Sequence, residues 1–137
     1  MKTSLPSLLM IGFAALNAII ALDLEAEAGH GELEAEFGEY AVHLFHTSAK
    51  YHMWHVLGLI GFGALYDLWT DRWTRLAIGL GGLALALGII FFSGGMYRVP
   101  YGGTLTPVIV GAVFQMAGWG MLFIATISRY IAQRSNP

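Results

Sequence analysis

The chain has 137 residues, of which 56% are hydrophobic and only 12% charged, and its formal net charge is −2. Soluble domains carry about 25% charged residues, so this composition excludes an ordinary soluble globular protein and indicates a lipid environment. The chain has no cysteine, which also excludes disulfides, thiolate metal sites and cysteine nucleophiles.

Four apolar runs are long enough to cross a bilayer, which takes roughly 20 helical residues. They cover residues 5–22, 51–69, 76–96 and 105–127. We therefore predict an all-α integral membrane protein with a single transmembrane domain over 1–137, in which four helices form a compact bundle. The first run follows Lys2 as the apolar part of a signal peptide would. It is long for that role, and we expect a retained spanning helix.

The connection at 23–50 is the only long one. In its second half, apolar residues recur at helical spacing and would form one stripe: Leu33, Phe37, Tyr40, Ala41 and Leu44. This pattern predicts a short amphipathic helix that lies on the membrane surface before the second spanning helix.

The same connection is strongly acidic, with seven of the nine acidic residues between Asp23 and Glu39. A solvated segment is one interpretation. The other is a patch that docks a basic extracytoplasmic partner, for which the candidate residues are Glu32, Glu34, Glu36 and Glu39.

The basic residues predict the orientation, because positive charge is enriched in cytoplasmic segments. With four spans, one side of the membrane would carry Lys2, Arg72, Arg75, Arg129 and Arg134, and the other only Lys50 and Arg98. Both termini are therefore expected in the cytoplasm, with the acidic, histidine-rich connection outside.

The five histidines lie close together in the sequence, at His30, His43, His46, His52 and His55. Each pair three residues apart could chelate copper or zinc, with His30 or a carboxylate completing a site at His52 and His55. On an unbroken helix the two pairs would face nearly opposite sides. Haem held by two histidines within one chain is disfavoured, because only one spanning helix carries histidine. We predict no cofactor, with His52 contacting water or headgroups and His55 donating to Ser93 or a carbonyl.

Polar residues from all four predicted spans fall in the outer half of the bundle. They are Asn17, Tyr51, His55, Ser93, Tyr97, Thr106 and Gln115. Polar side chains in lipid turn inward and find partners. A hydrogen-bond network that fixes the helix register is therefore the favoured interpretation, and a ligand or proton site is the alternative.

Small residues recur on three of the predicted spans, and in lipid they allow helices to approach closely. The candidate packing positions are Gly58, Gly61, Gly81, Gly88, Gly95, Gly111 and Gly118. Packing within one bundle is favoured over a dimerisation face.

Three motifs occur in order along the chain: AKYHMWHVLGL at 49–59, GIIFFSGGMY at 88–97 and LTPVIVGAVFQMAGWGML at 105–122. Together they resemble the DUF423 family of small multi-pass membrane proteins, which includes the YgdD-like and YwdK-like proteins. The resemblance implies the fold and a location in the bacterial cytoplasmic membrane, and no established reaction.

Catalytic signatures are missing from the sequence, including a nucleophile elbow, a phosphate loop, a dinucleotide fingerprint and a basic nucleic-acid patch. We therefore predict a protein that is not an enzyme and does not bind nucleic acid. The favoured function is an accessory subunit of a larger membrane complex, docking through its helix faces and acidic loop. The alternatives are a metal- or haem-handling membrane protein and a small-solute transporter that works as an oligomer.

Overall fold

A computed structural model describes residues 3–135 of the chain, and all regular structure in this range is helical. The helices are α1 (Leu5–Gly29), α2 (Glu32–Phe37), α3 (Glu39–Leu68), α4 (Arg72–Gly88), the π-helical turn η1 (Ile89–Ser93), α5 (Gly94–Arg98) and α6 (Thr106–Ser135). The prediction of an all-helical protein is confirmed over this range.

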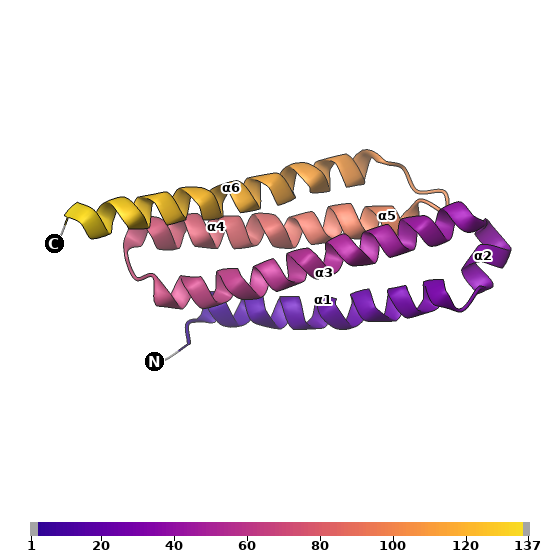
Figure 1. The fold of residues 1–137 in the computed structure, drawn as a ribbon, viewed down its shortest axis with the longest axis horizontal. Helices are drawn as coiled ribbons and strands as arrows, with labels where there is room; N and C mark the ends of the chain where they lie inside the picture. The colour runs from indigo at the N-terminus through magenta and orange to yellow at the C-terminus, as the bar shows by residue number, and fades with distance from the viewer. Residues whose placement is uncertain (1–2, 136–137) are drawn as a thin grey trace.

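The four long helical segments run antiparallel and lie side by side in the order α1, α3, α4 and α6 (Figure 1). The chain forms two closely packed pairs, α1 with α3 and α4 with α6, which are joined mainly where α3 meets α4. All four segments contribute to one main apolar core, which includes Ala14, Phe62, Leu85 and Ala125. We refer to the end that holds α2 as the α2 end and to the opposite end, where α1 begins and α6 finishes, as the termini end.

Three helical segments of the described chain are long and apolar enough to cross a membrane: Leu5–Gly29, Arg72–Arg98 and Thr106–Arg134. Helix α3 is not one of them, because its histidines, Lys50 and Asp67 lower its mean hydropathy. Composition and length therefore support three of the four expected crossings.

The expected long loop at 23–50 is instead mostly helix, since α1 continues to Gly29 and α3 begins at Glu39. The segment after residue 22 is rich in alanine, leucine and glutamate, which are strong helix formers, so the helix does not stop where the apolar run stops. The breaks come at Gly31 and Gly38, whose φ angles of 80° and 81° are left-handed and favour glycine. At 1.5 Å per residue, α3 is about 45 Å long, well beyond the roughly 30 Å hydrocarbon core.

The predicted surface helix also differs from the observed structure. Most of its apolar stripe is buried against other helices, in a second core separate from the main one. This core contains Ala28, Leu33, Ala41, Phe45, Ala49 and Tyr97, with Leu24, Phe37 and Val42 packed around it. Within the predicted stripe, Tyr40 is 67% exposed. The break at Gly38 divides the stripe between α2 and α3, and its buried residues pack with residues of α1 and α5.

Helices α1 and α3 are joined by polar contacts along their whole length. The backbone N–H of Ser4 donates to Asp67 Oδ2 at 3.1 Å, and the Ser7 hydroxyl donates to the Gly63 carbonyl at 2.8 Å. Two further contacts, described below, join Asn17 to His52 and Glu25 to His46.

The pair of α4 and α6 is held differently, by glycines that face the partner helix. A Cβ on Gly81 would meet Phe62, Met121 and the Gly118 carbonyl, and one on Gly88 would meet Gln115. A Cβ on Gly95 would meet Pro107 and Val108, and one on Gly118 would meet Leu85. Gly58 of α3 lies against the Trp119 ring. A Cβ on Gly61, by contrast, would have no neighbouring group within 4 Å. Gly61 is exposed and does not belong to the packing set.

Candidate functional site

A buried chain of hydrogen bonds links α1 to α3 in the half of the protein toward the α2 end. The Asn17 amide nitrogen donates to the Phe13 carbonyl at 2.9 Å, so the Asn17 carbonyl oxygen is left as an acceptor. That oxygen lies 3.2 Å from His52 Nε2, which therefore carries the proton. The other ring nitrogen, His52 Nδ1, is then an acceptor, and it is buried without a hydrogen-bond partner.

Next to His52, the helical hydrogen bonding of α4 changes to the π-helical turn η1. The Ser48 hydroxyl of α3 donates to the Ser93 carbonyl at 3.1 Å. The Ser93 hydroxyl is buried without a hydrogen-bond partner, the Tyr97 hydroxyl is buried near Ser48, and the Tyr97 ring lies 6.1 Å from the His52 ring. Single π-helical turns occur often at functional sites. The turn brings Ser93 against Ser48 of α3, and Tyr97 of the following helix α5 packs near His52.

On the neighbouring face of α3, one turn along from His52, His55 faces α6. Its Nδ1 donates to the Tyr51 carbonyl at 2.6 Å, which makes Nε2 an acceptor. The amide nitrogen of Gln115 donates to the Gly88 carbonyl at 3.4 Å. His55 and Gln115 line the same groove between α3 and α6, together with Tyr51, Phe92, Ala112, Met116 and Trp119.

The structure thus separates the predicted polar network into two sites. Asn17, Ser93 and Tyr97 lie on the side of His52, whereas Tyr51, His55 and Gln115 lie in the groove. Thr106 is exposed at the start of α6 and joins neither site.

Ser48 and His52 belong to the buried site, although the sequence pattern did not predict them there. His52 was expected to contact water or headgroups, but it is only 3% exposed. The available signal was helical phase: Ser48, His52 and Leu59 fall on one face of α3, and Leu59 marks that face as buried.

The five histidines make different contacts. His46 pairs with Glu25 at 2.8 Å on the surface, His52 faces α1 and His55 faces α6. His30 caps the end of α1, and His43 is exposed. In residues 3–135, no three side chains of histidine, aspartate or glutamate are grouped so that they could hold an ion.

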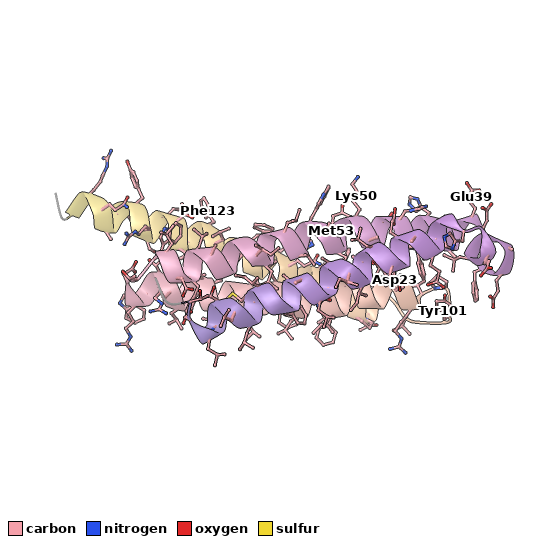
Figure 2. All side chains as sticks on the ribbon, turned by 90° about the horizontal axis from the view of Figure 1, so that it is seen from below. Asp23, Glu39, Lys50, Met53, Tyr101 and Phe123 are labelled. Atoms are coloured by element: carbon pink, nitrogen blue, oxygen red, sulfur yellow. The ribbon has the colours of Figure 1, made fainter. Side chains whose placement is uncertain are left out.

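The α2 end is acidic and exposed. The candidate docking residues Glu32, Glu34 and Glu36 lie on α2, and Glu39 begins α3; all four are exposed. Figure 2 shows Glu39 near the tip of this end, with Lys50 and Asp23 closer to the middle of the molecule and Phe123 toward the termini end. The carboxylates therefore form the outer surface over the second core.

At the termini end, Asp71 organises the connection between α3 and α4. It caps α4 by accepting from the Thr74 N–H at 2.9 Å, and Arg129 of α6 lies 3.5 Å from its other oxygen. Interactions with the Thr74 side chain and backbone N–H, helped by the charge of Arg129, lower the pKa of Asp71 below its ordinary value. The basic side chains Arg72, Arg75, Arg129 and Arg134 all belong to this end. Lys2, the other predicted marker of this side, lies outside the described residues.

Residues 24–118 match the protein family described as "Protein of unknown function (DUF423)". A UPF0382 membrane protein of Staphylococcus aureus is 32% identical over 123 residues, which cover 86% of this chain and 94% of the relative. The UPF0382 membrane protein YwdK of Bacillus subtilis is 30% identical over 118 residues, covering 82% and 91%. The UPF0382 inner membrane protein YgdD of Escherichia coli is 27% identical over 123 residues, covering 86% and 88%. No solved structure matches the chain.

Proposed function

Because this chain belongs to the DUF423 family, whose relatives are membrane proteins, we propose that it is a non-catalytic, multi-pass accessory subunit of a larger membrane complex. The observation that carries the proposal is the α2 end, which combines a second apolar core with an exposed acidic surface. A projection with its own apolar core, in a chain whose sequence has no catalytic motif, is better suited to docking a partner than to catalysis.

The proposal includes a fourth crossing by α3. This helix runs antiparallel to α1, packs on it along its length and also contacts α4. Both neighbours belong to segments that are apolar enough to span the membrane. The polar side chains that lower the hydropathy of α3 include His52, which is buried and bonded to Asn17. Because His52 bonds to Asn17 and His55 to the Tyr51 carbonyl, these two histidines do not prevent α3 from crossing the bilayer between its neighbours.

The proposed orientation places the termini end in the cytoplasm. That end holds Arg72, Arg75, Arg129 and Arg134, whereas Lys50 and Arg98 lie toward the α2 end. The excess of basic residues favours cytoplasmic placement of the termini end. The acidic α2 end would then project outside the cytoplasmic membrane.

The projection has the properties of a docking surface. At 1.5 Å per residue, the eleven residues from Glu39 to Ala49 form a stretch of α3 that is about 16 Å long. The second core packs α1, α2 and α5 around this stretch. The carboxylates are therefore held on a rigid support rather than on a free loop. A basic segment of a neighbouring subunit would be attracted to them at long range when salt is low.

The test is native-detergent purification with identification of co-purifying subunits, for the wild type and for the variant Glu32→Gln, Glu34→Gln, Glu36→Gln and Glu39→Gln. We expect the neutralised variant to lose the partner, most clearly at about 0.01 M salt, where the Debye length is about 30 Å. The matched control changes Asp67→Asn at the termini end, which should keep the partner. Equal recovery of partners with the neutralised variant at both high and low salt would contradict docking through the α2 end.

A further inference from the structure

Helices α3 and α6 leave a groove between them on the side toward the α2 end. They meet where the Trp119 ring packs on Gly58. Above that contact, the groove has a volume of about 480 Å³ and is lined by Tyr51, His55, Phe92, Gln115, Met116 and Trp119. Sites for small molecules have volumes of roughly 300–1,000 Å³, mostly apolar walls and a few placed polar groups. This groove has that character and opens toward lipid in the proposed membrane orientation.

The walls of the groove are largely aromatic. The Tyr51 ring lies 5.6 Å from Phe92 and 6.5 Å from His55, and the His55 ring lies 6.3 Å from Trp119. Flat ring faces at these separations favour offset or edge contacts with another ring. A planar aromatic guest therefore fits these walls better than a branched aliphatic one.

Two side chains of the groove present hydrogen-bond acceptors, while the Tyr51 hydroxyl and the Trp119 indole N–H in its lining are donors. His55 uses the proton on Nδ1 for the Tyr51 carbonyl, so Nε2, at the far edge of the ring, presents a lone pair. Gln115 uses its amide nitrogen for the Gly88 carbonyl, so its side-chain oxygen stays an acceptor. No lysine, arginine, aspartate or glutamate lines the groove. The site is thus matched to a neutral guest that donates a hydrogen bond.

We propose that this groove binds a membrane-soluble hydroquinone, with its ring between Tyr51, Phe92 and Trp119 and a hydroxyl donating to His55 Nε2 or the Gln115 side-chain oxygen. A phospholipid headgroup fits less well, because the groove has no cation for its phosphate. The oxidised quinone fits less well too, because its carbonyls cannot donate to His55 Nε2 or to the Gln115 side-chain oxygen. This binding site is separate from the carboxylates of the α2 end, so it stands independently of the docking proposal.

The test uses the full chain in detergent, with Trp54→Phe, Trp69→Phe and Trp73→Phe so that Trp119 is the only tryptophan. The probe is tetramethylhydroquinone, kept reduced under argon, and binding is followed as saturable quenching of Trp119 emission. Its dimethyl ether has the same ring without donors. We expect the ether to bind about tenfold more weakly, which is the effect of losing one hydrogen bond.

Two variants remove the acceptors with little change in volume. We expect at least one of Gln115→Met and His55→Phe to weaken hydroquinone binding about tenfold while ether binding stays unchanged. The matched control is His46→Phe, which removes an exposed histidine outside the groove and should bind like the parent. Thermal unfolding checks that each variant is folded. If His55→Phe does not fold, Gln115→Met and the ether comparison still decide the result.

Three outcomes would overturn the proposal. Equal binding of hydroquinone and ether would show an apolar slot that any lipid chain can fill. Unchanged hydroquinone affinity in folded Gln115→Met and His55→Phe would show that the acceptors do not take part. The absence of saturable quenching would show that the groove binds no such ring.

Discussion

The backbone of α6 at Gly111 lies directly against the backbone of η1 at Phe92. A Cβ on Gly111 would overlap the Phe92 nitrogen and Cα, which are main-chain atoms that cannot rotate away. The π-helical turn and the glycine therefore require each other, and this contact fixes α6 beside both polar sites.

Gly111→Ala should strongly destabilise the protein, because the added methyl can be placed only by moving α6 away from η1. Overpacking of this kind lowers the free energy of unfolding by about 1–3 kcal/mol. Because the atoms on both sides are backbone and cannot rotate away, we expect a loss at the upper end of this range or above it. The measurement is the free energy of unfolding during denaturant titration in detergent. Gly61→Ala is the matched control: it has nothing within 4 Å and should gain about 0.5–1 kcal/mol from helix propensity. Equal effects of the two substitutions would contradict the close approach.

The bond between Asn17 and His52 should be measurable as a coupling between α1 and α3. Asn17→Leu leaves His52 Nε2 without its acceptor, and His52→Leu removes the donor. The double variant removes both, so it should be more stable than the two single effects predict together. Hydrogen bonds within membrane proteins give coupling energies of about 0.6 kcal/mol on average and about 1.7 kcal/mol at most. A double-mutant cycle that gives a coupling of zero would contradict the bond.

Asp71 should make stability depend on acid pH. Its pKa is lowered in the folded protein through Thr74 and Arg129, so its contribution is present above the ordinary value of 3.8 and is lost as the pH falls through the lower, folded value. Thermal unfolding in detergent, followed from pH 6 downward, should show this loss beginning near the ordinary pKa. Asp71→Asn keeps a capping side chain without the charge, so the advantage of the wild type over this variant should shrink in the same range. An advantage independent of pH would contradict the assignment.

The orientation can be tested with reporter fusions at Gly29, in the α2 end, and at Thr70, between α3 and α4. We expect the Thr70 fusion to report the cytoplasm and the Gly29 fusion to report the outside, because α3 crosses between them. If both fusions report the same side, α3 does not cross the membrane.

Metal content gives a test of the alternative function. The histidines are distributed over different surfaces, so we expect protein purified without chelator to hold less than stoichiometric copper or zinc. His55→Leu should leave this content unchanged. One equivalent of metal or haem that disappears in His55→Leu would favour the metal-handling alternative over the docking proposal.

Helix existence was predictable from apolar runs, but helix ends were not. The run at 5–22 stops where lipid-compatible residues stop, whereas α1 continues to Gly29 because the following residues still favour helix. In the same way, Leu33 and Leu44 follow a helical period that looks like a membrane-surface stripe. Periodicity shows that one face is apolar, and it does not show whether lipid or another helix covers that face.

The polar site was predictable in part for a related reason. Asn17, Ser93 and Tyr97 stood out because polar side chains are rare within apolar runs. The sequence did not mark Ser48 and His52 as their partners, because several other polar residues surround them in the stretch 43–55. The choice between His52 and His55 as the partner of α1 depends on the rotation of α3 about its axis, which is fixed by packing at residues such as Leu59 and Phe62. The π-helical turn η1 has no simple sequence signature in this chain.

The polar contacts between α1 and α3 also bear on the order in which the protein is made. Ser4, Ser7, Asn17 and Glu25 precede Asp67, Gly63, His52 and His46 in the chain. During synthesis α1 is therefore complete before its partner α3, the long helix that is too polar to qualify as a span by hydropathy, leaves the ribosome. In the proposed topology, α3 paired with α1 can enter the bilayer as half of a hairpin before α6 has left the ribosome.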